Sequence, residues 1–306
     1  MTYYITHTTN YYYSNSVSLC HNLTHLAART CPWQVCLRNE LQFSSPPAVS
    51  ITRTDYFGNT VTFFTVQKPH KKLEITAINE VQVHPRPIPD PASTMPWEQV
   101  SHLLQTCRDE EALEAYQFVF DSHYVKRDPA LAEYAAPSFL PGRPLLDSVL
   151  DLTRRIFAEF AFDPAADNFE TPPHELLKTR RGVCQDFAHF QVGCLRSLGL
   201  AARYVSGYLL TNPPPGQDRL VGADMSHAWA SVFCPGFGWI DVDPTNDVVT
   251  QEKHITLAWG RDYDDVSPIK GVILGGGRHS VKVGVDVRVT QPAPPTEVKE
   301  AVGEAK

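Results

Sequence analysis

The 306-residue sequence predicts an α+β protein in which an N-terminal β domain precedes a domain of helices packed on an antiparallel sheet. Two changes of pattern along the chain carry this prediction. Strand-length runs of β-branched and aromatic residues fill the first part, and after a proline-rich segment the spacing of apolar residues becomes helical. We therefore predict a β domain over 1–84, a linker over 85–96, a second domain over 97–290 and a disordered tail over 291–306.

The bulk composition excludes several classes of partner. The net charge is −7 and the basic residues are scattered, so we expect no binding of nucleic acid. No window approaches about 18 uninterrupted apolar residues and the first residues lack the pattern of a signal peptide, so we expect no membrane span. The seven cysteines are odd in number and irregularly spaced, which is typical of reduced thiols in the cytoplasm. The sequence leaves the oligomeric state open.

The β domain is predicted from two strand-like runs and a turn. "VTFFTV" (61–66) is rich in β-branched and aromatic residues, "LEITAINEVQV" (73–83) alternates loosely, and "DYFGN" (55–59) supplies a turn. The linker follows, with five prolines within residues 84–96, and proline at that density forces extended backbone. We expect the chain to pass from one domain to the next there.

The second domain is predicted to begin with helices and to continue with strands. Its clearest helix, 145–160, has a broad apolar stripe with helical period, and a shorter helix follows at 172–178. A third helix covers 184–199, where Gly199 suits the left-handed residue that ends many helices. The predicted strands are 202–210, 227–233, 238–243 and 281–289, and a long proline-containing loop, 211–224, is expected to border the substrate cleft.

The last of these strands is the most regular segment of the chain. Within 281–289 valine occupies every odd position, so we expect the valine face to be buried and the other face to be exposed. The glycines at 275–277 lack the strand and helix context of a nucleotide-binding loop. We interpret them as a turn.

The stretch "RRGVCQDFAHF" (180–190) suggests a reactive thiol at Cys184. Gly182 should let the backbone turn sharply, which places Cys184 at or beside the N-terminus of the third helix. Free N–H groups and the helix dipole stabilise a thiolate there, and the same N–H groups are suited to hold the oxyanion of a tetrahedral intermediate. A small, buried and unreactive cysteine is the alternative interpretation.

A histidine and an aspartate downstream complete the groups that acyl transfer needs. His227 begins the predicted strand 227–233, and Asp243 ends the strand 238–243. With a three-residue loop at 234–236 the hairpin would place His227 directly opposite Asp243, with both side chains on one face. A thiol, an imidazole that deprotonates it and a carboxylate that orients the imidazole are the machinery of thiol-dependent acyl transfer.

Other candidate residues have structural interpretations. Asp186 and His189 lie near the thiol in sequence, but we expect both to support the structure rather than to react. Trp229 and Trp239 are predicted on the face that carries His227, as core residues or as walls of the cleft. The cysteines and histidines within 20–36 fit no familiar zinc spacing, so we expect no metal site there.

These segments resemble the transglutaminase-like superfamily of papain-like thiol enzymes. "RRGVCQDFAHF", "SHAWASVF" and "GWIDVDPTND" occur in the family's order, and "HITLAWGRDYDDVSPIKGVILGGG" (254–277) is similar to the C-terminal stretch of its bacterial branch. "HTTNYYY" and "RTDYFGN" resemble the N-terminal β domain of that branch, so the resemblance covers nearly the whole chain. It implies a papain-like fold with Cys184 as nucleophile, His227 as general base and acid, and Asp243, which directly precedes Pro-Thr, as the orienting carboxylate.

The resemblance also implies the reaction class. We expect thiol-dependent acyl transfer on amide bonds of a peptide or protein through a thioester, with hydrolysis as in a cysteine protease or amidase. Attack of a lysine-like amine on the thioester would give protein-glutamine transglutamination instead. A transglutaminase-like module that only binds a partner, and a structural thiol protein, are further alternatives. Neither a cofactor nor a metal is implied.

Overall fold

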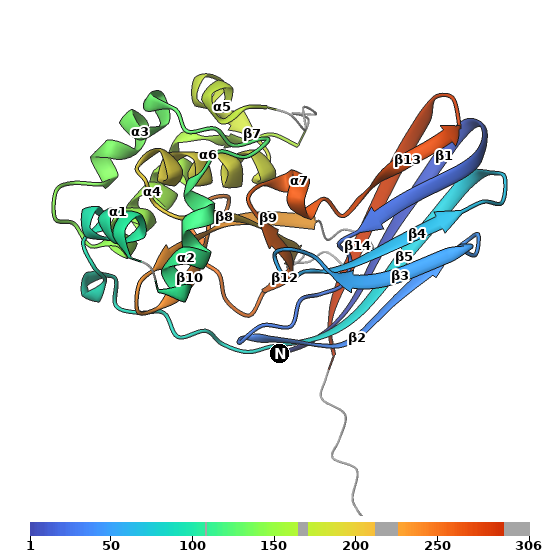
Figure 1. The fold of residues 1–306 in the computed structure, drawn as a ribbon, viewed down its shortest axis with the longest axis horizontal. Coiled ribbons are helices and arrows are strands. Elements are labelled where there is room, and N and C mark those ends of the chain that lie inside the picture. The colour runs from blue at the N-terminus through green and yellow to red at the C-terminus, as the bar shows by residue number, and fades with distance from the viewer. Residues whose placement is uncertain (108, 165–170, 212–225, 291–306) are drawn as a thin grey trace, which may run out of the picture.

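The computed structural model describes residues 1–107, 109–164, 171–211 and 226–290. Figure 1 shows two parts side by side, one a β-sheet and the other a second sheet covered by helices. Strand pairs within each of the two large sheets are antiparallel. The α+β class and the strand-rich N-terminal domain predicted from the sequence are confirmed.

The first sheet is built around β1, a strand of 23 residues (Thr2–Thr24). Alternate side chains in its first half are buried, as the period of two along a strand requires. Five strands of this sheet follow the order β2-β5-β1-β4-β3, and β13 and β14 also pair with β1. The bounds are β2 (Gln34–Phe43), β3 (Val49–Thr54), β4 (Thr60–Val66), β5 (His70–Val83), β13 (Ile269–Gly275) and β14 (His279–Thr290).

The strands β13 and β14 return from the end of the second domain to the first sheet. β14 pairs with residues 2–13 of β1, and β13 pairs with residues 17–24. This differs from the division expected from the sequence, in which the second domain extends to residue 290. The residue pattern of a strand shows which face is buried but not which strand is its partner. The glycines at 275–277 all have positive φ and form the turn between β13 and β14.

The valine face of β14 is buried only in part. Val285 and Val287 are buried, whereas Val281, Val283 and Val289 are exposed, so the expectation of a fully buried valine face is wrong. The buried pair lies where the first sheet meets the second domain. The apolar core at this contact consists of Tyr3, Ile5, Ala28, Val81, Val83, Tyr208, Ile255, Leu257, Val285 and Val287.

The second domain holds a five-stranded sheet in the order β11-β10-β9-β8-β12. Its strands are β8 (Ala202–Leu209), β9 (Ser226–Cys234), β10 (Gly238–Asp243), β11 (Val248–Val249) and β12 (His254–Gly260). The α-helices are α1 (Trp97–Thr106), α2 (Glu110–Tyr116), α3 (Pro129–Ala135), α4 (Leu145–Glu159), α5 (Pro173–Thr179), α6 (Cys184–Ser197) and α7 (Tyr263–Val266). Short 3-10 helices cover Pro91–Ser93, Gln117–Val119 and Ala136–Ser138, and β6 (Ala161–Phe162) pairs in parallel with β7 (Arg181–Gly182).

Helix α6 is the central element of the second domain. Every residue from Gln185 to Arg196 is buried, because sheet strands pack on one side and other helices on the other. The helices predicted at 145–160, 172–178 and 184–199 are confirmed within two residues at each end. Gly199 has the predicted left-handed backbone, with φ of 77°.

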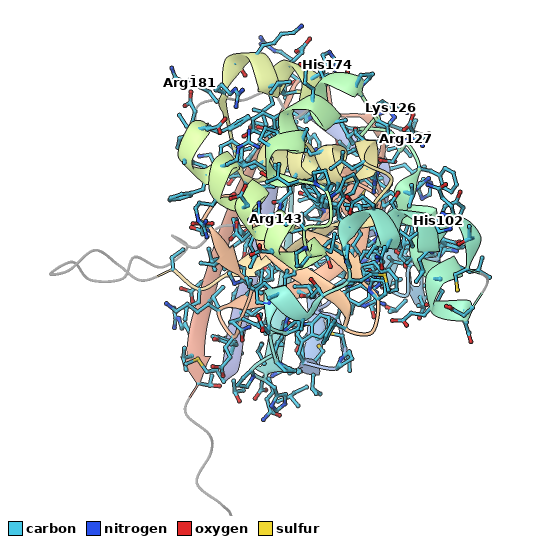
Figure 2. The ribbon with its side chains drawn as sticks, turned by 90° about the vertical axis from the view of Figure 1, so that its left-hand side faces the viewer. His102, Lys126, Arg127, Arg143, His174 and Arg181 are labelled. Carbon is cyan, nitrogen blue, oxygen red and sulfur yellow. The ribbon has the colours of Figure 1, made fainter. Side chains whose placement is uncertain are left out.

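The surface of the helical part carries separated basic groups. Figure 2 shows the labelled side chains spread over the helical part rather than gathered into one patch: His102, Lys126, Arg127, Arg143, His174 and Arg181. Across the part of the chain that the structure describes, no helix combines the length and apolar character needed to cross a bilayer. The predicted loop 211–224 lies outside the described residues except for its first position.

Candidate active site

Cys184 is the first residue of α6, at the helix N-terminus that the sequence predicts. Val183 is the N-cap, and its backbone N–H donates to Asp186 Oδ2 at 2.9 Å, so a carboxylate closes the first turn. The thiol is half-buried beside the positive end of the helix dipole. It packs on a cluster formed by Ala188, Tyr204, Ala228, Ala258, Val266 and Tyr263.

Gly182 is required by close packing rather than by a sharp turn. It lies in β7 with ordinary backbone, and the left-handed residue nearby is Arg180, with φ of 54°. A Cβ at Gly182 would lie 2.6 Å from Asp186 Oδ2 and 2.9 Å from Leu176 Cδ1. The expected glycine turn is therefore wrong. Gly182 leaves room for the carboxylate that caps α6.

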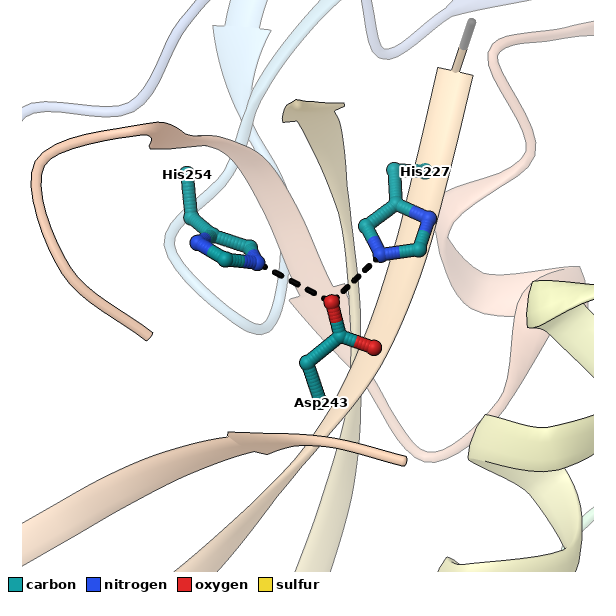
Figure 3. Close-up of side chains that lie close together, drawn as sticks. All are labelled: His227, Asp243 and His254. Atoms are coloured by element: carbon teal, nitrogen blue, oxygen red, sulfur yellow. Dashed lines mark hydrogen bonds and ion pairs between the residues drawn. The ribbon is translucent and has the colours of Figure 1, made fainter. Parts of the chain in front are cut away.

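His227 lies near the start of β9, between the thiol and a carboxylate. Its Nε2 is 2.7 Å from Asp243 Oδ2 (Figure 3), and its imidazole interacts with the neighbouring Cys184 thiol. Because Nε2 faces Asp243, Nδ1 is the ring nitrogen left for the thiol. His227 is 8% exposed and Asp243 is fully buried, so these interactions lie in a region of low dielectric. The structure thus brings together the three residues predicted for the site.

The register of the β9–β10 hairpin differs from the expected one. Asp241 pairs with Ser231, so the three-residue loop begins at Pro235, one residue later than expected. Direct opposition of His227 and Asp243 is therefore wrong, and the two residues meet diagonally. Their side chains still share a face, because a register change of two residues preserves the alternation.

Burial and hydrogen bonding act in opposite directions on the charges of the site. Burial lowers the pKa of His227, but its interactions with Asp243 and Cys184 outweigh burial and raise the pKa to about 10. Burial also favours the protonated form of Asp243, yet hydrogen bonds from His227 and His254 hold its pKa well below its usual value. A protonated imidazole beside the thiol is the environment that stabilises a thiolate.

Asp243 accepts more hydrogen bonds than the sequence suggests. Its Oδ2 accepts from His254 Nε2 at 3.0 Å and from Asn246 Nδ2 at 2.7 Å, and its Oδ1 accepts from the Thr245 N–H at 2.9 Å. His254, the first residue of β12, is a site residue that sequence reasoning missed. Its only signal was its position at the start of the family-like segment 254–277.

Asp241 is close to Asp243 in sequence but binds different groups. Its Oδ2 accepts from Arg86 Nη1 at 2.7 Å and from Trp229 Nε1 at 3.1 Å. Burial opposes its charge, but Arg86 and Arg203 lower the pKa of the carboxyl below its usual value. The two aspartates therefore serve separate parts of the molecule.

Asp186 and His189 have the structural surroundings that the sequence suggests. Burial raises the pKa of Asp186 to about 6, and its carboxylate caps α6. His189 accepts a hydrogen bond from the Tyr263 N–H at 3.1 Å and stacks on Tyr124, with ring centroids 5.6 Å apart. Burial lowers the pKa of His189 to about 4, so the ring is neutral near pH 7.

One group of described side chains also has the spacing of metal ligands. The ligand atoms of His227, Asp243 and His254 lie within 4.8 Å of one another. In the present arrangement both histidines direct Nε2 at Asp243 Oδ2 (Figure 3). A metal ion would replace these hydrogen bonds, including the one that raises the pKa of His227. The cluster as it stands suits acid–base chemistry.

Helices on an antiparallel sheet, with a thiol at a helix N-terminus and its histidine on a strand, are the arrangement of papain-like thiol proteins. Family profiles lead to the same conclusion. The profile described as "Transglutaminase-like superfamily" matches residues 133–244, and the profile described as "Bacterial transglutaminase-like N-terminal region" matches residues 3–82. The chain belongs to the transglutaminase-like superfamily, in its bacterial branch.

Individual relatives extend this likeness over more than nine-tenths of the chain. An uncharacterized protein of Mycobacterium tuberculosis is 40% identical over 293 residues, which are 93% of this chain and 92% of the relative. A protein-glutamine gamma-glutamyltransferase of Pseudomonas aeruginosa is 29% identical over 152 residues, 48% of this chain and 23% of that protein. The crystal structure of a candidate cysteine protease from Cytophaga hutchinsonii superposes with a TM-score of 0.74 at 20% identity, over 96% of this chain and 93% of that one. This superposition shows that the two chains share a fold.

Proposed function

We propose that the protein is a cysteine amidase or protease that hydrolyses amide bonds in a peptide or protein. Cys184 acts as the nucleophile, His227 as general base and acid, and Asp243 as the orienting carboxylate. The observation that carries this proposal is the placement of Cys184 at the N-terminus of α6 beside His227, whose Nε2 is hydrogen-bonded to Asp243.

The proposed reaction has two halves. His227 takes the thiol proton, and the sulfur attacks the carbonyl carbon while backbone N–H groups at the start of α6 hold the oxyanion. The C–N bond breaks as the imidazolium gives its proton to the leaving amine, which leaves a thioester on Cys184. Water then attacks the thioester, His227 takes a proton from that water, and the acid departs as the thiol regains its proton. This sequence requires no cofactor or metal.

Transglutamination is the second candidate reaction. A primary amine would take the place of water in the second half, and the product would be a new amide. The relative named protein-glutamine gamma-glutamyltransferase, which aligns with 48% of this chain, supports it. We also propose a cytoplasmic location, supported by the seven cysteines, all among the described residues and none in a disulfide.

Peptides that contain glutamine test the proposal. Wild-type protein and Cys184→Ala are incubated with such peptides, with and without a primary amine, and products and adducts are identified by mass. We expect a thioester on Cys184 and amine-independent conversion of the amide to the acid, with no reaction in the variant. Product that forms only with the amine would favour transglutamination. The absence of any adduct or product would favour a module that only binds a partner.

A further inference from the structure

A large cavity lies where the first sheet, the linker and the second domain meet. Its volume is about 1020 Å³, and no residue of the proposed triad lines it. Its walls come from the loop after β1, from linker residues 85–89, and from β8, β10 and β12. A cavity of this volume is large enough to enclose a small organic ligand. Its polar lining includes Arg29, Trp33, Arg86, Arg203, Trp239 and Trp259.

Arg203 is the most deeply buried arginine in this cavity. It is 4% exposed, and its guanidinium stacks on the indoles of Trp239 and Trp259, 4.2 and 3.8 Å from the ring centroids. Burial lowers the pKa of Arg203 to about 9, so the guanidinium remains charged near neutral pH. Stacking holds the group in a fixed position within the wall.

The Arg203 guanidinium has no hydrogen-bond acceptor among the described residues. Its Nε is buried without a partner, and Asp241, the carboxylate that attracts it, gives its Oδ2 to Arg86 and Trp229. Buried donors are almost always paired, since an unpaired one loses its hydration without compensation. An acceptor from outside the protein would meet this requirement.

Other hydrogen-bond donors in the cavity wall are also without an acceptor. Arg29 Nε, Trp33 Nε1 and both Nε and Nη2 of Arg86 are buried without acceptors. Arg86 also lies over the Trp33 ring, 3.9 Å from its centroid. The unpaired buried acceptors of the lining are Asp241 Oδ1 and Thr250 Oγ1, so unpaired donors outnumber acceptors.

The lining also carries more positive than negative charge. Three arginines face two carboxylates, and one of these carboxylates, Glu114, is exposed at the surface. The other, Asp241, is already paired with Arg86. The buried part of the cavity therefore carries surplus positive charge.

We propose that this cavity binds an organic anion, a carboxylate or phosphate head with an apolar body. The planar guanidinium forks of Arg203 and Arg86 suit the paired oxygens of either head. The apolar body lies against wall residues such as Ile88, Phe118 and Ile240. The site is separate from Cys184 and does not depend on the proposed hydrolysis.

Small aromatic probes test this site in the intact protein. Three of the five tryptophans line the cavity, so binding is followed by tryptophan fluorescence and by calorimetry. We expect saturable binding of hydrocinnamate or phenyl phosphate, and binding at least about tenfold weaker for the uncharged hydrocinnamamide. The tighter of the two anions identifies the head group. Affinity should be the same in Cys184→Ala, which separates this result from the proposed reaction.

Charge-removing variants locate the binding. Arg203→Met keeps the length of the side chain and should weaken anion binding by about tenfold or more. Arg29→Met is the second variant, and circular dichroism shows whether each variant folds. Where both fold, both are measured. Where Arg203→Met does not fold, Arg29→Met replaces it. Arg181→Met is the matched control, because Arg181 is 67% exposed on the helical part, where Figure 2 labels it.

The proposal would be overturned by equal affinity for the amide, by no saturable binding of either anion by the wild-type protein, or by unchanged affinity in every folded variant that lacks a cavity arginine. An equal loss of affinity in Arg181→Met would overturn it as well, because binding would then follow overall charge.

Discussion

The charge on the His227 imidazole depends on one carboxylate oxygen. Asp243 Oδ2 accepts hydrogen bonds from His227, His254 and Asn246 in a region almost closed to solvent. An anion fixed in this way at low dielectric favours a proton on the neighbouring imidazole. The environment of the Cys184 thiol is therefore set by groups that do not touch it.

Asp243→Asn should lower kcat/KM for amide hydrolysis by about a thousandfold, because the imidazole loses both its orientation and the anion that favours its charge. The pKa of His227, raised to about 10 in the wild type, should fall. The imidazolium donates the proton to the leaving amine, so activity is lost as pH rises through that pKa. The alkaline limb of kcat/KM against pH should therefore move to lower pH.

Asp241→Asn is the control for that substitution. Asp241 binds Arg86 in a buried ion pair, so its loss should lower the free energy of unfolding by about 3 kcal/mol in denaturant titrations. The alkaline limb should stay in place. If the limb moves in Asp241→Asn and not in Asp243→Asn, the assignment of the carboxylate is wrong.

Iodoacetamide near neutral pH should alkylate Cys184 before the other cysteines. Cys184 lies at the N-terminus of α6 beside His227, whereas burial raises the pKa of Cys31 and Cys36, which are also only half-buried. Peptide mapping after partial labelling measures the order. Equal rates at Cys184, Cys31 and Cys36 would contradict a reactive thiol.

His254→Phe should lower kcat/KM by about tenfold, the effect of one lost hydrogen bond to a charged group. Without the His254 donor the pKa of Asp243 rises, and the carboxylate holds His227 less firmly. His254→Gln, which can still present an N–H donor, should recover most of the rate. Similar kinetics for both variants and the wild type would show that His254 only fills space.

Cys184, His227 and Asp243 could be predicted because each stands at the end of a locally recognisable element. The residues near a helix N-terminus or a strand end are enough to predict it. His254 could not be found in this way, because its contact with Asp243 depends on long-range strand order. The unpaired donors of Arg86 and Arg203 depend likewise on contacts between distant segments.

At the scale of elements, the close approach of β8, β9 and β12 places the groups of the site. A Cβ at Gly207 in β8 would lie 2.2 Å from the Ile255 carbonyl oxygen and 2.5 Å from Trp229 Cη2. The Trp229 indole in turn donates to Asp241 and packs edge-on against His254, with ring centroids 5.2 Å apart. One missing side chain thus allows three strands to meet beneath the site.

Gly207→Ala should lower the free energy of unfolding by about 2 kcal/mol, because neither the backbone of β12 nor the indole can move away cheaply. Displacement of Trp229 should also change its fluorescence and slow alkylation of Cys184. Gly284→Ala in β14 is the matched control, since an added Cβ there meets nothing within 4 Å. Equal stability of the two variants in denaturant would argue against this role for Gly207.

The elements themselves were predictable where the signal is local. The stripe of α4 and the bounds of β10 follow from apolar spacing and neighbouring turns. The register of β9 on β10 was wrong by two residues because it depends on where the loop begins, and several three-residue loops fit the same letters. The prediction of a sharp turn at Gly182 was wrong for a similar reason. A glycine is needed there because the Asp186 side chain packs against it, and this contact is not visible in the local sequence.

At the scale of the whole molecule, the chain begins and ends its described part in the same sheet. β1 is bonded along residues 2–12 to β5 and along residues 2–13 to β14 (Figure 1). The second domain is therefore an insertion between strands of the first sheet, joined to it by the core that contains Val285 and Val287. Local sequence patterns predicted the β domain and the helical domain. They could not predict that β13 and β14 pair with β1, because these contacts join segments far apart in the chain.

Removal of residues 269–306 should therefore destabilise the first sheet although it leaves the 1–84 segment intact. β1 would keep β5 and β4 but lose β14 along residues 2–13 and β13 along residues 17–24, and the backbone groups left unpaired would favour aggregation. Val285 and Val287 alone contribute about 2 kcal/mol each through burial.

Removal of only 291–306 is the control, because that segment has too few apolar residues to add to a core. Thermal unfolding and gel filtration should show a wild-type transition for the control and a lowered, broadened transition with aggregates for the longer truncation. Identical transitions for the two would mean that the first sheet is complete without β13 and β14.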